Sequence, residues 1–181
     1  MTRTVLVPLD GSLHSHAILD RLDRVIGPGE ARVVMLTVAE PSAVVVGAGA
    51  AQNMDPLAIV GSFAPATVSS VSRGGWEKKG EYAYREAQKQ LKGYLEKKAE
   101  VLRARGYEVE TEVGFGNAAD TIIDYARAND VDAIAMTTHG RTGLARIVFG
   151  SVAAKVLQSG VAPVILFRPP RLSETETEED R

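Results

Sequence analysis

The sequence predicts an α/β fold: a single domain built on an open, parallel five-stranded sheet with helices on both of its faces. Short apolar runs alternate along the chain with longer segments whose apolar residues recur at helical spacing. The first two short runs are apolar at both odd and even positions, as strands covered on two faces are. A strand–helix–strand alternation of this kind requires crossover connections and therefore indicates parallel strand pairing.

The first part of the chain is predicted to contain two strands and one helix. Residues 4–9 (TVLVPL) form the first strand, which ends at the polar turn Asp10-Gly11-Ser12. The second strand covers residues 32–39 (RVVMLTVA) and ends at Glu40-Pro41. Between the strands, apolar residues recur at helical spacing until Gly27-Pro28-Gly29 stops the helix. These residues are Ile18, Leu22, Val25 and Ile26.

Residues 42–80 show no periodicity and carry very few charges before Arg73. Connections of this length are uncommon inside compact domains and are usually functional lids or disordered segments. The low charge does not suit a solvated linker, because such linkers are normally polar or charged. Two roles for residues 42–80 therefore stay open: a partly mobile loop, and a lid or partner-binding arm.

Regular alternation returns in the second part of the chain. An amphipathic helix is predicted over residues 81–105, with Lys, Arg and Glu interleaved on a solvated face. Its apolar stripe consists of Tyr84, Ala87, Leu91, Leu95 and Leu102. Beyond this helix we expect a strand at 107–113, a helix at 118–128, a strand at 131–136, a helix at 151–158 and a last strand at 163–167.

The composition is that of a globular domain and excludes several kinds of site. The chain has 181 residues, which suffices for one domain with a substantial core. It contains no cysteine, so disulfides and thiolate chemistry are excluded, and three histidines make a histidine-rich metal site unexpected. We predict a folded domain over residues 1–169 and an acidic, disordered tail over residues 170–181.

Charge and hydropathy also exclude two classes of partner. Outside the acidic stretch after Ser173, 20 basic and 18 acidic residues remain, so no broad basic field indicates nucleic acid. No apolar run approaches the roughly 18 residues of a membrane-spanning helix, and the first apolar run is too short for a signal peptide. We therefore expect a cytoplasmic protein with no nucleic-acid or membrane partner.

The most informative segment covers residues 136–153 (MTTHGRTGLARIVFGSVA), where the fourth strand runs through a glycine-bearing loop to Gly150-Ser151 at the start of a helix. Glycine lets the backbone approach a ligand closely, and free N–H groups at a helix N-terminus attract anions. Arg141 and Arg146 add positive charge to the loop. This pattern predicts a phosphate site, and hence nucleotide binding.

The turn Asp10-Gly11-Ser12 is expected to lie beside this loop. We expect strand order 3-2-1-4-5, a Rossmann-like arrangement in which the first and fourth strands are central neighbours. Ligands of open parallel sheets lie beyond the carboxyl ends of the strands, where the strand order reverses, so both loops open into one crevice. The base and ribose would lie toward Asp10, and the phosphates toward Gly140 and Gly150.

The sequences of these segments resemble those of the universal stress protein family. VLVPLDGS at residues 5–12 and TTHGRTGLARIVFGSVA at residues 137–153 are similar to the two motifs of that family. APVILF at residues 162–167 is similar to its final strand. The resemblance covers the chain apart from residues 42–80 and the tail after Pro169, and it implies a stress-response protein.

The resemblance favours the ATP-binding members of the family, which carry Gly, two residues, Gly, nine residues, and then Gly-Ser or Gly-Thr. Here Gly140, nine residues, Gly150 and Ser151 are present, whereas Thr137 stands at the first glycine position. The resemblance then implies roles for individual residues. Asp10, with backbone from Pro8, Leu9 and Val38, would hold adenine; Met136 and Thr137 would line the ribose; Gly140, Arg141, Gly150, Ser151 and Val152 would bind phosphate. We expect Mg²⁺ or Mn²⁺ to accompany ATP, held mainly by the phosphates.

Several of these residues have alternative structural roles. Asp10 could be only a helix N-cap, Gly150 could only permit close helix packing, and Ser151 could only cap its helix. A capping box would need Glu or Gln at position 154, where the chain has Ala154. His139 is a further candidate ligand residue whose alternative is a structural role in the loop. His14 and His16 are expected to be exposed residues at a helix start, without a role.

The sequence contains no complete hydrolytic apparatus. Neither the P-loop pattern GxxxxGK[ST] nor a G-x-S-x-G elbow is present. Phosphoryl transfer also needs a group that positions the attacking nucleophile, and the sequence indicates none. We therefore expect a regulatory nucleotide-binding protein without catalytic residues. The alternatives are a slow ATPase that uses the same pocket, and a nucleotide-free interaction module that acts through residues 42–80.

The last predicted strand, from Pro163 to Phe167, is apolar along its whole length. An apolar strand at the edge of a sheet invites pairing with another strand. Members of the family that this chain resembles commonly pair through their last strand. A homodimer through residues 163–167 is the resulting expectation.

Overall fold

The computed structural model describes residues 2–39, 76–137 and 150–168. The five strands of this part of the chain are β1 (Arg3–Pro8), β2 (Ala31–Ala39), β3 (Glu108–Phe115), β4 (Ala133–Thr137) and β5 (Val164–Phe167). The helices are α1 (Leu13–His16), the 3-10 helix η1 (Leu19–Arg24), α4 (Trp76–Ala104), α5 (Ala118–Ala128) and α6 (Ser151–Ser159). The elements alternate between strand and helix, as the sequence predicts.

The strands form one sheet in the order β3-β2-β1-β4-β5, and every pairing in it is parallel. The predicted fold class and strand order are therefore confirmed. Side chain and backbone together set the register between the central strands. The Thr4 amide donates to Asp132 Oδ2 at 2.7 Å, and the Asp132 amide donates to the Thr4 carbonyl at 2.9 Å. This double contact fixes β4 beside β1.

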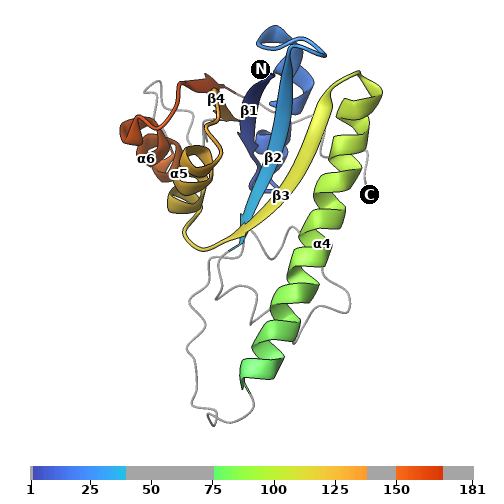
Figure 1. The fold of residues 1–181 in the computed structure, drawn as a ribbon, viewed down its shortest axis with the longest axis vertical. Coiled ribbons are helices and arrows are strands. Elements are labelled where there is room, and N and C mark those ends of the chain that lie inside the picture. Colours follow the sequence, from blue (N-terminus) through green and yellow to red (C-terminus); the bar gives the residue numbers. More distant parts are fainter. Residues whose placement is uncertain (1, 40–75, 138–149, 169–181) are drawn as a thin grey trace, which may run out of the picture.

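Helices cover both faces of the sheet (Figure 1). One face packs against η1 and α4 and forms a first core cluster, which includes Val7, Met35, Leu22, Leu95 and Leu102. The other face packs against α5 and α6 and forms a second core cluster, which includes Leu6, Val34, Ile122, Ile134 and Val156. Successive residues of β1 and β2 point to opposite faces, which explains why both strands have apolar residues at odd and at even positions.

The predicted strand bounds differ from the observed ones by one or two residues. The largest extension is in β3, which continues past the predicted end at residue 113 because Gly114 pairs with Val38 and Phe115 with Ala39. Gly114 permits this pairing, since a Cβ there would lie only 2.5 Å from Thr121 Cγ2. Absence of a side chain thus lets α5 pack closely over the end of β3.

The prediction of a single helix between the first two strands is wrong. Instead of one α-helix, the chain forms the four-residue α1 and then the 3-10 helix η1. Residues i and i+3 share a face in a 3-10 helix, so Leu19 joins Leu22 in the core. Ile18 and Ile26 are also buried, whereas Val25 ends η1 and is 37% exposed.

The predicted start of the long helix is also wrong, because α4 begins at Trp76 and not at residue 81. The last five residues of the predicted 42–80 loop are therefore helical, and residues 40–75 lie outside the described part of the chain. The predicted apolar stripe is confirmed: Ala87, Leu91, Leu95 and Leu102 are buried, and Tyr84 is half-buried. Tyr84 contacts Phe115 of β3, with ring centroids 4.7 Å apart.

Two glycines provide a matched pair of substitutions with opposite expected effects. Gly114→Ala forces Thr121 to move and should lower the free energy of unfolding by about 1–3 kcal/mol. A Cβ at Gly93, in the middle of α4, would meet nothing within 4 Å, so Gly93→Ala should raise the free energy of unfolding by about 0.5–1 kcal/mol. Urea titrations followed by circular dichroism measure both changes.

Thr121→Ser supplies the control for this mechanism, because it removes the Cγ2 atom that the new methyl group would meet. The double variant Gly114→Ala/Thr121→Ser should therefore recover most of the lost stability. A Gly114→Ala protein as stable as the parent would contradict the close packing of α5 on β3.

Candidate functional site

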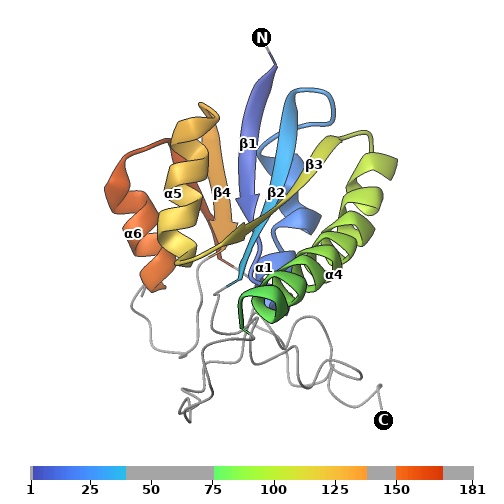
Figure 2. The same cartoon turned by 60° about the horizontal axis from the view of Figure 1, so that its bottom comes forward.

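The candidate site lies at the carboxyl edge of the sheet, where β1 and β4 end side by side (Figure 2). The connection after β1 passes over the face covered by η1 and α4, whereas α6, which follows β4, packs on the opposite face. The strand order reverses between β1 and β4, and the two connections diverge there. This is the position at which open parallel sheets bind ligands.

The chain leaves β1 along a path that β2 holds in place. Leu9 is buried; its amide donates to the Leu36 carbonyl at 2.8 Å, and its carbonyl accepts from the Thr37 hydroxyl at 2.6 Å. Thr37 is itself only 1% exposed. Both backbone polar groups of Leu9 are thus already hydrogen-bonded, so Leu9 contributes to the shape of the site and not a new donor.

Asp10 follows as an exposed residue, and Ser12 fixes its side chain. Asp10 Oδ1 accepts from the Ser12 amide at 3.0 Å and from the Ser12 hydroxyl at 2.7 Å. Ser12 Oγ in turn accepts from the Ser15 amide at 3.1 Å. The side chain that caps the start of α1 is therefore that of Ser12. Asp10, two residues earlier, orients this cap by accepting the hydrogen bond of the Ser12 hydroxyl.

His16, at the end of α1, corrects the expectation of an exposed residue without contacts. It is half-buried, and its Nε2 atom hydrogen-bonds the hydroxyl of Tyr94 on α4. Burial lowers the pKa of His16 below its usual value of 6.5; the positive charge of Lys98 lowers the pKa further, and the carboxylates of Asp10 and Asp20 oppose that shift. His16 is therefore neutral at pH 7.

Beside the end of β1, β4 ends with Met136 and Thr137. Met136 is buried in the second core cluster, so its side chain belongs to the core and only its backbone reaches the edge. Thr137 is 7% exposed and pairs with Phe167 of β5. His139, Gly140 and Arg141, which the sequence indicates as ligand residues, lie outside the described residues, as does Arg146.

The helix α6 begins at this edge without a side-chain cap. Gly150 is the N-cap residue; it has ordinary extended angles (φ −58°, ψ 153°), and the first turn of α6 has no acidic residue. Ser151 is exposed and Val152 is half-buried against the second core cluster. The first N–H groups of an α-helix have no partner within the helix, so the start of α6 offers amide donors and a partial positive charge.

Eight of the predicted residues thus lie around the ends of β1 and β4 and the start of α6, and Val38 lies further along the edge, on β2. Val38 lies near the end of β2, where its side chain packs against the second core cluster. Sequence reasoning missed two positioning residues, Ser12 and Thr37. The Asp-x-Ser-x-x-Ser spacing of residues 10–15 was an available signal for Ser12, because it is typical of an Asx turn followed by a helix cap. No local signal marks Thr37, since its partner Leu9 is distant in sequence.

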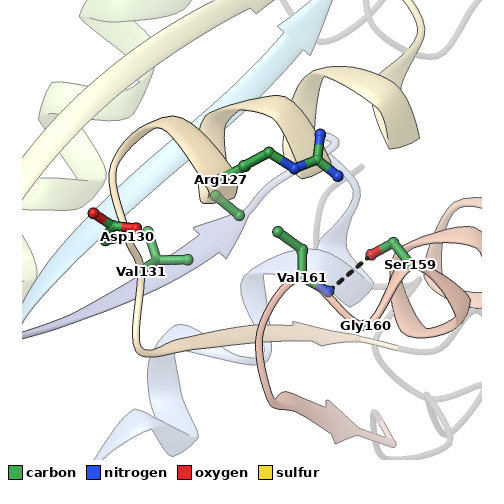
Figure 3. Close-up of a pocket in the computed structure, with 7 residues that line it drawn as sticks. Arg127, Asp130, Val131, Ser159, Gly160 and Val161 are labelled. Atoms are coloured by element: carbon green, nitrogen blue, oxygen red, sulfur yellow. Dashed lines mark hydrogen bonds between the residues drawn. The ribbon is translucent and has the colours of Figure 1, made fainter.

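An open depression occurs at the opposite, amino edge of the sheet (Figure 3). It lies between the end of α5 and the turn into β5, and its lining includes Arg127, Asp130, Ser159 and Val161. Ser159 Oγ accepts weakly from the Val161 amide at 3.4 Å, and Arg127 pairs with Asp124. Its polar groups therefore serve the local turn, and it is separate from the candidate site.

In the described part of the chain, no group of three or more His, Cys, Asp or Glu side chains is placed to hold a metal ion. Among the same residues, no helix is both long and apolar enough to cross a membrane.

The lowered pKa of His16 predicts a pH dependence of stability. Unfolded His16 has its usual pKa of 6.5, so just below pH 6.5 the unfolded chain binds more protons than the folded chain. The free energy of unfolding should therefore decrease as the pH falls below 6.5. His16→Gln should flatten this decrease while it leaves the contribution of other groups in place. Urea titrations between pH 5 and pH 8, on the parent and the variant in parallel, give the difference; identical pH profiles would contradict the prediction.

Comparison with solved structures places this architecture among known folds. The structure of the hypothetical protein MJ0577 matches with a TM-score of 0.65 at 20% identity, over 95% of this chain and 99% of that one. A universal stress protein in complex with cAMP matches with a TM-score of 0.51 at 18% identity, over 92% of this chain and 97% of that one. These matches show a shared Rossmann-like α/β fold.

The chain is also similar in sequence to universal stress proteins. Universal stress protein MJ0531 of Methanocaldococcus jannaschii is 34% identical over 100 residues, which cover 55% of this chain and 56% of that protein. YxiE of Bacillus subtilis, also a universal stress protein, is 32% identical over 74 residues, or 41% of this chain and 50% of that protein. The matches span about half the length of these relatives. The model of the universal stress protein family matches residues 50–168, and the chain belongs to that family.

Proposed function

We propose that this protein binds an adenine nucleotide, with ATP as the expected ligand, in the crevice between the turn after β1 and the start of α6. One observation carries the proposal: β1 and β4 are neighbours whose following connections lie on opposite faces of the sheet. That arrangement puts the exposed carboxylate of Asp10 and the uncapped start of α6 at the same edge.

The start of α6 supplies the phosphate end of the proposed site. Backbone amides of Ser151 and Val152, the Ser151 hydroxyl and the helix dipole together favour a polyanion. The nearest cation on the helix, Lys155, is engaged by Asp120 at 2.7 Å and lies one turn further on. Gly140 and Arg141, and His139 beside them, complete this end of the site in the proposal.

The turn after β1 supplies the adenine end. Asp10 is the hydrogen-bonding group there, while the backbone of Pro8 and Leu9, and that of Val38 on β2, borders the adenine. The backbone of Met136 and Thr137 borders the ribose. The cAMP named for one family structure supports adenine nucleotides as the ligand class. In this proposal the protein has a regulatory role in a stress response, and Mg²⁺ or Mn²⁺ is held mainly by the phosphates.

Replacing Gly150 by a larger residue tests the phosphate end. The extended backbone angles of Gly150 suit any residue, so Gly150→Val should leave the fold intact. Its side chain would stand where the phosphates approach the helix, and we expect ATP affinity to fall at least tenfold. Isothermal titration with ATP and Mg²⁺ measures the affinity, and circular dichroism checks the fold.

Asn117→Ala is the matched control for that variant. Asn117 caps α5, whose start lies at the same edge of the sheet but follows β3, and its side chain accepts from the Asp120 amide. Loss of this cap should cost about 1 kcal/mol of stability and leave ATP affinity unchanged. Equal affinity of the Gly150→Val and parent proteins would refute the placement of the phosphates.

We also propose that two copies pair through β5. The outer strands of the described sheet differ in character: β3 exposes Glu108, Glu110 and Glu112, whereas β5 carries Val164–Phe167, all apolar and half-buried. Like charges along an edge disfavour pairing, and an apolar edge favours it.

Sedimentation velocity tests this pairing directly. The parent protein should sediment as a dimer, and Ile165→Lys should shift it to the monomer because the new charge lies on the pairing strand. Leu157→Lys serves as the control, since Leu157 is 43% exposed on α6 and outside β5. A parent protein that remains monomeric at micromolar concentration would overturn the dimer.

A further inference from the structure

Helix α4 reaches the candidate site through Tyr94, whose side chain contacts His16. The Tyr94 hydroxyl hydrogen-bonds His16 Nε2, and the two rings lie 5.7 Å apart at an interplanar angle of 33°. Tyr94 also packs against the first core cluster, which includes the fully buried Leu95 of the same helix. The packing of its ring therefore holds the Tyr94 hydroxyl in a fixed position.

From His16, hydrogen bonds within the same turn connect its backbone to Ser12 and Ser12 to Asp10. The His16 amide donates to the Ser12 carbonyl at 3.2 Å, and the Ser15 hydroxyl donates to the same carbonyl at 2.9 Å. The Ser12 hydroxyl then donates to Asp10 Oδ1. Tyr94 is thus connected to the one carboxylate that the proposed site directs at the base, through residues of a single short turn.

The turn over residues 10–16 is not stable on its own. Its helix, α1, has four residues, and a helix that short does not form alone because the first turn costs more than it gains. The turn therefore depends on contacts with the rest of the protein. Toward the core those contacts are the buried Leu9 and Ser15; toward α4 the contact is the Tyr94–His16 pair.

We propose that Tyr94 and His16 are positioning residues for Asp10, so that α4 sets the affinity of the site for the nucleotide. This inference rests on the proposed function, because it gives a regulator to the same site. Tyr94 does not touch the nucleotide in this account. It acts by keeping the turn over residues 10–16 in the conformation that binds.

Tyr94→Phe tests the inference, because it removes the hydroxyl and keeps the ring in the core. Tyr107→Phe is the matched control: it removes another hydroxyl, which donates to the Ile26 carbonyl at 2.9 Å at the far end of η1. The Tyr94 variant should bind ATP about three- to fivefold more weakly, the effect of one lost hydrogen bond. The Tyr107 variant should bind ATP as the parent does, even where it loses similar stability.

Asp10→Ala shows whether Tyr94 acts through Asp10. In that background, Tyr94→Phe should cause no further loss of ATP affinity, because the residue that Tyr94 positions is gone. Independent effects of the two substitutions, which multiply in the double variant, would overturn the inference.

Hydrogen exchange separates failure of this inference from failure of the proposed function. Without nucleotide, amides of residues 10–16 should exchange at least threefold faster in Tyr94→Phe than in the parent or in Tyr107→Phe. A parent protein that binds no adenine nucleotide refutes the proposed function, and the exchange rates still decide whether Tyr94 holds the turn. Unchanged exchange, or faster exchange with unchanged ATP affinity, refutes the positioning role.

Discussion

The parallel pairing of β1 with β4 determines where the candidate site lies. The Thr4 amide and the Asp132 side chain fix this pairing at the amino edge, with the reciprocal bond from the Asp132 amide to the Thr4 carbonyl. With the two strands side by side, the η1 and α6 connections must lie on opposite faces, and the carboxyl edge opens between them. A contact at one edge of the sheet thus determines where a ligand can approach at the other.

The fold could be predicted because its causes are local in the sequence. In β1 and β2, apolar residues occupy odd and even positions alike because alternate residues enter different core clusters. The stripe from Ala87 to Leu102 follows the helical period and is buried as expected. Glycine-bearing loops separate these elements. Such features need no knowledge of distant contacts, which explains why the type and succession of the elements agree with the prediction.

Much of the candidate site depends on distant contacts, and there the sequence was a poorer guide. Asp10 and Gly150 could be singled out because each follows a strand or begins a helix. The bond from Thr37 to Leu9 and the burial of His16 by Tyr94 arise from packing between elements, whereas the capping role of Ser12 is local and its spacing in the sequence indicates it. The 3-10 form of η1 was not predictable from the pattern, since the apolar residues at positions 18, 22 and 26 suit an α-helix, whereas those at positions 19, 22 and 25 suit a 3-10 helix. Thr137, the departure from the family pattern, ends β4 as a nearly buried residue.

Nucleotide binding at the carboxyl edge is tested most directly by a titration of the isotopically labelled protein with ATP and Mg²⁺, followed through its backbone amide resonances. We expect the amides of residues 9–12 and 150–153 to shift together with one affinity, while those around Asp130 and Gly160 at the opposite edge do not shift. Shifts confined to the depression at the amino edge, or no shifts at millimolar ATP, would contradict it.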